Sequence, residues 1–221
     1  AQLQAIRNLA SLPIDFTCSM VITPENVQSL CESVQIAHDN GAKQFSFTFI
    51  IDNDDAKEKD LAYLQKHDPI KLVSDFISQI DKLSAITDDW WVEYSFQMCM
   101  YTEEQLKLLK GRLATPCQIH LKNAVTFNTK MELLPCDMYI YQRLGKFGRD
   151  FSSYQGFLSL TESANYSKTM DEIRRLPSDE CTTCEHFGVC YGGCLVLWKN
   201  YSFSALKEFK AKAHHSGVSG E

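Results

Sequence analysis

Nine cysteines are the residues of this 221-residue chain whose spacing could do chemistry. Four of them fall within CTTCEHFGVCYGGC (181–194), which has the spacing C-x2-C-x5-C-x3-C. Thiolates are soft ligands that suit zinc, copper(I) and iron–sulfur clusters. Gly188, Gly192 and Gly193 allow the tight turns that wrapping a metal requires. The first residues lack the basic-then-apolar pattern of a secretion signal, so we expect metal binding in a cytoplasmic protein rather than a disulfide framework.

Zinc and iron–sulfur clusters are the two metal groups that this spacing leaves open. Four cysteines can form a tetrahedral structural zinc site. Zinc ribbons, however, usually join two C-x2-C pairs through a longer loop, whereas here a C-x3-C pair follows after only five residues. A zinc-binding structural or protein-interaction module without redox activity is therefore the alternative to a cluster-binding protein.

The spacing C-x2-C-x5-C-x3-C resembles the signature of the SPASM domain, the C-terminal iron–sulfur extension of many radical SAM enzymes. Upstream, Cys117 and Cys136 resemble the two cysteines that precede the signature in that family. Met131 stands where the family has glycine. No cysteine follows Cys194, where the family usually has one more. The resemblance covers about residues 1–200.

The resemblance implies that six cysteines hold one or two iron–sulfur clusters of the [4Fe–4S] type. It assigns them to an inner auxiliary cluster on Cys117, Cys136 and Cys194 and to an outer auxiliary cluster on Cys181, Cys184 and Cys190. Each set is one ligand short, so the last position would take substrate, water, or an oxygen or nitrogen ligand; His186 and Asp179 are near in sequence. A single shared cluster, as in the shorter twitch variant, is the other arrangement.

The three remaining cysteines lie outside the motif. Cys18 lies in an apolar strand pattern and Cys31 on the apolar face of a predicted helix, so both are interpreted as core residues. Cys99 follows a predicted strand and is either a core residue or an extra ligand of the inner cluster.

Radical SAM enzymes bind their catalytic cluster through C-x3-C-x2-C, and this sequence has no such triplet. The resemblance therefore implies that the chain is the C-terminal part of a longer enzyme, lacks the N-terminal part of its barrel, and is inactive alone. The intact parent would be an oxidoreductase or maturase that cleaves S-adenosylmethionine and modifies a peptide or protein substrate.

Strands and helices alternate in the first half of the chain. Apolar periodicity predicts strands over 14–22, 45–51 and 90–98 and helices over 1–10, 23–41, 68–83 and 102–113. Such alternation indicates parallel βαβ units. The predicted fold is α/β, with partial (β/α) barrel-like units followed by a small irregular α+β, cysteine-rich, SPASM-like iron–sulfur domain.

The second half is less regular. The pattern predicts a hairpin of 124–129 with 131–135, a short helix over 170–176 and a disordered tail over 214–221, while 51–60 in the first half reads as a solvated charged loop. The predicted domains are 1–115 (partial barrel with a linker helix), 116–200 (auxiliary cluster domain) and 201–221 (C-terminal helix and tail).

Charge and hydropathy exclude two classes of partner. Lysine and arginine number 22 against 28 acidic residues, a net charge of −6. Nucleic acids and membrane surfaces are both anionic, so neither is expected as a partner. The apolar runs are also far shorter than the roughly 20 residues of a membrane-spanning helix.

Overall fold

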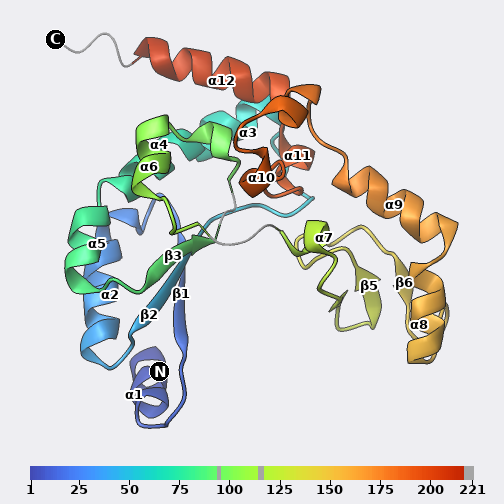
Figure 1. Cartoon of the computed structure of the whole chain (residues 1–221), viewed down its shortest axis with the longest axis horizontal. Helices are drawn as coiled ribbons and strands as arrows, with labels where there is room; N and C mark the ends of the chain where they lie inside the picture. The colour runs from blue at the N-terminus through green and yellow to red at the C-terminus, as the bar shows by residue number, and fades with distance from the viewer. Residues whose placement is uncertain (94–95, 114–116, 217–221) are drawn as a thin grey trace. The chain divides into compact units, whose positions relative to one another are not determined.

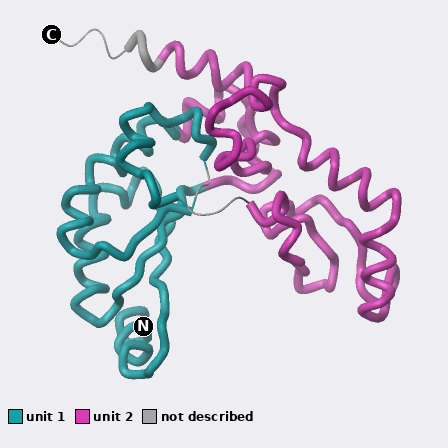
Figure 2. The backbone as a smooth tube through the Cα atoms, viewed as in Figure 1, with its two compact units in different colours: residues 1–50, 68–115 teal, residues 51–67, 116–221 magenta. Residues whose placement is uncertain are grey.

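The computed structural model of the chain describes residues 1–93, 96–113 and 117–216. The chain divides into two compact units (Figure 2). Unit 1 comprises residues 1–50 and 68–115, and unit 2 comprises residues 51–67 and 116–221. The chain therefore visits unit 2 once before it completes unit 1.

Unit 1 alternates strands and helices (Figure 1). Its strands form a parallel sheet in the order β1 (Thr17–Ile22), β2 (Gln44–Phe49), β3 (Trp90–Glu93). Its helices are α1 (Gln2–Ala10), α2 (Leu30–Asp39), α4 (Pro69–Ile77), α5 (Ile80–Ile86), α6 (Glu103–Leu108) and the 3-10 turns η1 (Val27–Ser29) and η2 (Met98–Met100). The parallel α/β arrangement predicted from the alternation is confirmed, and membership of a barrel stays a prediction.

An aromatic cluster forms the core of unit 1. Alternate residues of a strand lie on the same face, so Phe45, Phe47 and Phe49 of β2 lie together, and all three are buried. The rings of Phe47 and Phe49 lie 5.7 and 5.5 Å, centroid to centroid, from Phe76 of α4. Trp90 of β3 lies 6.2 Å from Phe47. Burying each of these side chains contributes about 1.5–3 kcal/mol to folding.

Helix α2 begins later than its sequence predicts. Residues 23–26 form a turn in which the Asn26 side-chain oxygen accepts the Thr23 N–H at 2.8 Å. The Thr23 carbonyl accepts the Val27 N–H at 3.1 Å, and the α-helix begins only at Leu30. The asparagine side chain offers the backbone a local partner, and this competition delays the helix.

The helix predicted over 68–83 is two helices. Asp68 caps α4 through its carboxylate, which accepts the Lys71 N–H at 3.0 Å. The chain turns at Ser78, because the Gln79 N–H donates to the Phe76 carbonyl three residues back instead of four. Helix α5 then starts at the next residue, so the prediction was right about helical character and wrong about continuity.

The third predicted strand, 90–98, is too long. Strand β3 ends at Glu93, and Met98–Met100 forms a 3-10 turn; residues 94–95 lie outside the described residues. A capping box begins α6: the Thr102 hydroxyl accepts the Gln105 N–H at 3.2 Å, and the Gln105 side chain accepts the Thr102 N–H at 2.9 Å.

Unit 2 contains a small antiparallel sheet and short helices. The sheet has the order β4 (Thr126–Phe127), β5 (Glu132–Leu134), β6 (Gly145–Lys146). The helices are α3 (Asp60–His67), α7 (Gln118–Leu121), α8 (Tyr154–Thr161), α9 (Ala164–Arg174), η3 (Asp179–Thr183), α10 (Phe187–Cys190), α11 (Leu197–Asn200) and α12 (Phe203–Ser216). The predicted hairpin is confirmed. In the described part of the chain, no helix is both long and apolar enough to cross a membrane.

Three predictions for the second half are corrected by these elements. The short helix predicted over 170–176 is the end of the longer α9, which Ser163 caps by accepting the Tyr166 N–H. Helix α8, capped by Ser153, was not predicted. The tail predicted as disordered continues α12 as far as Ser216, and residues 217–221 lie outside the described residues.

The segment 51–67 is attached to unit 2. Its helix α3 packs against α12. The Asp60 carboxylate accepts both the backbone N–H and the hydroxyl of Ser202 at 2.8 Å. The Lys59 ammonium donates to the Asn200 side chain at 3.1 Å. Residues 51–60 were predicted as a solvated charged loop; most of them are partly buried, and the hydrogen bonds of the segment make it part of the cysteine-bearing unit.

Candidate metal centre in the C-terminal unit

The nine cysteines divide between the two units. Unit 1 holds Cys18, Cys31 and Cys99, and unit 2 holds the six cysteines of the motif. All nine are free thiols without a disulfide. The proposed ligands are therefore carried by one unit.

The six unit 2 cysteines share one backbone feature. The carbonyl of each accepts a hydrogen bond from the N–H three residues further along the chain. The donors for Cys117, Cys136, Cys181, Cys184, Cys190 and Cys194 are His120 (2.9 Å), Tyr139 (3.2 Å), Cys184 (3.4 Å), Phe187 (3.0 Å), Gly193 (2.7 Å) and Leu197 (3.2 Å). Each candidate ligand therefore opens a tight turn of the chain.

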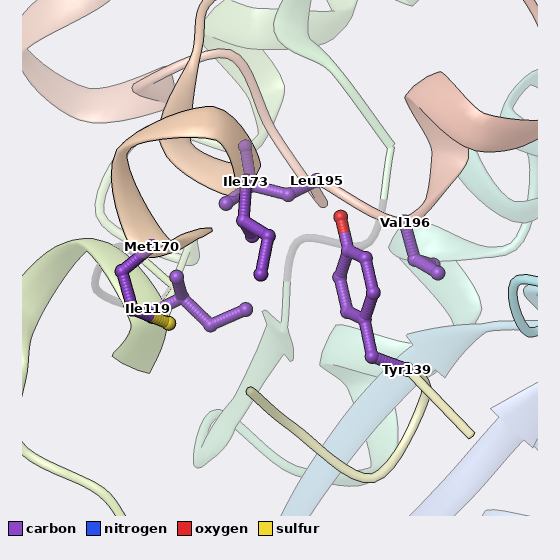
Figure 3. Close-up of a cluster of buried hydrophobic side chains, with 6 residues drawn as sticks. All are labelled: Ile119, Tyr139, Met170, Ile173, Leu195 and Val196. Carbon is purple, nitrogen blue, oxygen red and sulfur yellow. The ribbon is translucent and has the colours of Figure 1, made fainter. Parts of the chain in front are cut away.

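Cys117, Cys136 and Cys194 lie together, and we call them the inner group. All three side chains pack against one hydrophobic cluster, whose buried members appear in Figure 3: Ile119, Tyr139, Met170, Ile173, Leu195 and Val196. The thiols of Cys117 and Cys136 are electrostatic neighbours of the Cys194 thiol. The structure thus brings together three cysteines that are separated by up to 77 positions (194 − 117) in the sequence.

Backbone amides point at two sulfurs of the inner group. The N–H groups of Met138 and Tyr139 donate to the Cys136 thiol, and those of Val196 and Leu197 donate to the Cys194 thiol. The two cysteines therefore have the same environment, with donors at the second and third following residues. Hydrogen bonds of this kind stabilise a thiolate and tune the potential of a metal bound to it.

Burial opposes ionisation of the same two thiols. It is the main cause that raises the pKa of Cys194 to about 12, and the neighbouring thiols Cys117 and Cys136 raise this pKa further. Burial likewise raises the pKa of Cys136 to about 11. The backbone amides act against burial but do not overcome it. A cation bound among the sulfurs would supply the missing countercharge.

Cys181, Cys184 and Cys190 form the outer group. Cys181 lies in η3, Cys184 directly follows η3, and Cys190 is the last residue of α10. Burial raises the pKa of Cys181, and the thiols of Cys190 and Cys184 raise it further. The two groups are the same two sets that the resemblance implies from sequence, and their role as ligands stays a prediction.

Three successive left-handed residues join the last two motif cysteines. Tyr191, Gly192 and Gly193 have φ of 49°, 86° and 71°. The Trp198 indole N–H donates to the Gly192 carbonyl at 2.7 Å and holds the run in place. This geometry requires glycine, because other residues pay a steric penalty at positive φ. The chain thus reverses direction between Cys190 of the outer group and Cys194 of the inner group.

Met131 also has a left-handed backbone, with φ of 57°. It closes the turn between β4 and β5, where the Asn128 side chain accepts the N–H groups of Lys130 and Glu132. Residue 131 therefore differs from glycine in its side chain, but its backbone keeps a conformation that glycine adopts readily.

Asp54 clamps the turn that follows Cys136. Its carboxylate accepts the N–H groups of Ile140 (3.0 Å) and Tyr141 (3.3 Å). Its own N–H donates to the Met138 carbonyl at 3.2 Å. The sequence pattern missed this residue, because nothing local links position 54 to position 136.

Tyr139 is the second residue that the sequence did not single out. It is only 2% exposed, and its hydroxyl has no hydrogen-bond partner among the described residues. Burial raises its pKa, and Cys194, Cys136, Asp54 and Cys117 raise it further. The hydroxyl is therefore an electrostatic neighbour of all three thiols of the inner group but is hydrogen-bonded to none of them. Its position three residues after Cys136 was the only signal available.

The cysteines of unit 1 are placed differently. The Cys31 thiol lies 3.6 Å from the Gln79 backbone carbonyl and 3.8 Å from its side-chain oxygen, both within reach as acceptors. Cys18 is a residue of β1, paired with Phe45 of β2. Cys99 lies in η2. Cys18 and Cys31 are both only partly buried, so their interpretation as core residues is not confirmed.

The two residues suggested as non-cysteine ligands lie in the outer segment. Asp179 begins η3 and is exposed, and His186 directly precedes α10. Both are close in sequence to the outer group, and their role as ligands stays a prediction.

A pocket of about 420 Å³ lies beside the inner group. Its walls come from the residues that follow Cys117, those that precede Cys136, and α8 and α9. Ile119, Leu134 and Met170 contribute to its apolar lining, Lys122 and Arg174 contribute cations, and Asp171 contributes a carboxylate 3.8 Å from the Arg174 guanidinium. Arg174 is also structural, since its guanidinium donates to the Ile119 carbonyl at 3.0 Å.

No family model, curated protein or solved structure matches the chain.

Proposed function

We propose that unit 2 binds iron–sulfur clusters through its two groups of cysteines, as the auxiliary-cluster part of a radical SAM enzyme that modifies a peptide or protein. The observation that carries this proposal is the grouping of the thiols: Cys117, Cys136 and Cys194 lie together although they come from three separate segments. Buried thiols gather in this way at metal sites because the metal repays their desolvation.

The residues of the inner group fit a cluster in charge and in hydrogen bonding. Thiolates are the ligands of iron–sulfur clusters, and the amides near Cys136 and Cys194 are the donors that such sulfurs accept. A bound cluster supplies one-electron transfer. The chain's own residues hold the sulfurs, direct N–H groups at them and exclude water through the apolar neighbours Ile119 and Met170.

The pocket beside the inner group is the place we propose for a substrate side chain. Its apolar lining suits an aliphatic or aromatic group, and Lys122 and Arg174 suit a carboxylate of the same peptide. The proximity of this pocket to Cys117 and Cys136 would bring a bound peptide near the redox group.

Metal analysis of the full chain tests the proposal. We expect chain reconstituted anaerobically with iron and sulfide to retain both after desalting, and to show the charge-transfer absorption of a cluster that bleaches on reduction. Stoichiometric zinc in a colourless chain that refuses iron and sulfide would overturn the proposal and favour the structural zinc module.

A further inference from the structure

The hydroxyl of Tyr139 is a buried polar group that the fold leaves unsatisfied. The side chain is 2% exposed and belongs to the hydrophobic cluster beside the inner group. In Figure 3 the ring extends from its backbone with the hydroxyl oxygen directed toward the Leu195–Val196 segment, which directly follows Cys194. A buried hydroxyl without a partner costs about 1–3 kcal/mol of desolvation. An acceptor placed at this hydroxyl would therefore stabilise the site.

The surroundings of this hydroxyl identify the acceptor. Its electrostatic neighbours are the thiols of Cys194, Cys136 and Cys117 and the Asp54 carboxylate, whose two oxygens accept the N–H groups of Ile140 and Tyr141. A neutral thiol is a weak acceptor, whereas a metal-bound thiolate carries negative charge and accepts strongly. The amides of Met138 and Val196 already donate to two of these sulfurs. The Tyr139 hydroxyl is a further hydrogen-bond donor in the surroundings of these sulfurs.

We propose that the Tyr139 hydroxyl donates a hydrogen bond to a metal-bound sulfur of the inner group and that it is a positioning residue for that group. The inference rests on the proposed function, because it requires metal at Cys117, Cys136 and Cys194. A hydrogen bond to sulfur stabilises the more negative, reduced state of a cluster. Tyr139 therefore raises the reduction potential of the inner cluster.

The same chain provides a matched control. Tyr63 is also a buried tyrosine of unit 2, 3% exposed, and Cys194 is a minor electrostatic neighbour of it, but its hydroxyl is hydrogen-bonded with the Asp52 backbone and the Asn200 side chain. Tyr139→Phe and Tyr63→Phe both delete one buried oxygen. Only the first deletes a group that lacks a partner in the metal-free chain.

The test compares melting temperatures of the full chain in metal-free and iron–sulfide-reconstituted forms. In Tyr139→Phe we expect the metal-free melting temperature to be unchanged or higher and the rise on reconstitution to be smaller than in the wild type. In Tyr63→Phe we expect both forms to melt lower by the same amount. We also expect a more negative reduction potential in Tyr139→Phe and the loss of an exchangeable-proton coupling in its reduced electron–nuclear double resonance spectrum.

The outcomes separate the two proposals. A Tyr139→Phe chain that binds iron with the full wild-type rise in melting temperature and an unchanged potential would overturn the role of Tyr139 alone. A wild-type chain that takes up neither iron nor sulfide would overturn both the cluster proposal and this one.

Discussion

At the residue scale, two opposing effects act on the ionisation of the Cys136 and Cys194 thiols. Each accepts two backbone N–H groups, which favour the thiolate, and each is desolvated, which favours the neutral thiol. Burial dominates in both, so the metal-free fold holds them protonated at neutral pH. Metal binding must therefore displace protons, and the fold and the metal are coupled.

This coupling predicts a pH window for the metal-free chain. The folded pKa values of Cys136 and Cys194 are about 11 and about 12. Below about pH 9, both thiols are protonated in the folded and unfolded chains, and their contribution to stability is fully present. As the pH rises further, the unfolded chain ionises first. We expect this contribution to decline by about 1.4 kcal/mol per pH unit for each thiol until the folded pKa is passed.

Urea unfolding of the reduced, metal-free chain between pH 8 and pH 11 measures this decline. The control is the double variant Cys136→Ala/Cys194→Ala, which lacks both groups. Its free energy of unfolding should fall less steeply than that of the wild type. Parallel curves for the two chains would show that these thiols ionise alike in the folded and unfolded states.

At the scale of the element, backbone conformation explains what the residue pattern could not. Gly192 and Gly193 lie at positive φ, as the need for tight turns predicts. Met131 occupies a left-handed turn without being glycine. The side chain at position 131 does not match the glycine of the resembling family. The backbone nevertheless has the conformation that glycine adopts most readily.

At position 131 we expect glycine to be more stable than alanine, which reverses the usual order of these two residues. Glycine relieves left-handed strain that alanine retains, so we expect Met131→Gly to be more stable than Met131→Ala by about 1 kcal/mol. Lys168, exposed in the middle of α9, provides the control pair, where glycine should be less stable than alanine by about 1 kcal/mol. Thermal or urea unfolding of the four variants checks this, and the same sign at both positions would contradict the left-handed turn.

The segment 51–67 is the element that sequence reasoning could not place. The charge of residues 51–60 predicted a solvated loop, whereas most of these residues are partly buried and hydrogen-bonded within unit 2. Asp54 contacts residues more than 80 positions away. No local period or spacing encodes such a pairing, because it depends on the tertiary fold.

Loss of the Asp54 carboxylate should loosen the turn after Cys136. Asp54→Ala leaves the N–H groups of Ile140 and Tyr141 without their acceptor, and we expect a loss of about 1–3 kcal/mol. Hydrogen exchange of residues 136–141 should quicken. Asp55→Ala is the control, since Asp55 accepts only the exposed Tyr141 hydroxyl and should change stability by less than about 0.5 kcal/mol. Equal protection of 136–141 in both variants would contradict the clamp.

At the scale of the whole molecule, sequence reasoning reached the parallel sheet, the hairpin and the two groups of cysteines. The sheet follows from apolar alternation along β1 and β2, which is a local signal. The two groups came from a resemblance in spacing, and burial and side-chain neighbours gather the same residues. The position of Tyr139 depends on packing between distant segments, so local patterns could not predict it.

The absence of C-x3-C-x2-C predicts what the isolated chain cannot do. Under the proposed function, reductive cleavage of S-adenosylmethionine needs the catalytic cluster that this triplet binds. We expect the reconstituted chain, mixed anaerobically with dithionite and S-adenosylmethionine, to form no more 5′-deoxyadenosine than a protein-free control. Sustained formation above that control would mean that another group in the chain performs the cleavage.

The most direct test of the central claim is the iron and acid-labile sulfide content of two matched triple variants after anaerobic reconstitution. In Cys117→Ser/Cys136→Ser/Cys194→Ser the inner group is removed, and in Cys18→Ser/Cys31→Ser/Cys99→Ser the cysteines of unit 1 are removed. The account predicts that the first variant loses about four irons per chain, one [4Fe–4S] cluster, relative to the wild type, while the second keeps the wild-type content. Equal iron in the two variants, or the larger loss in the second, would contradict it.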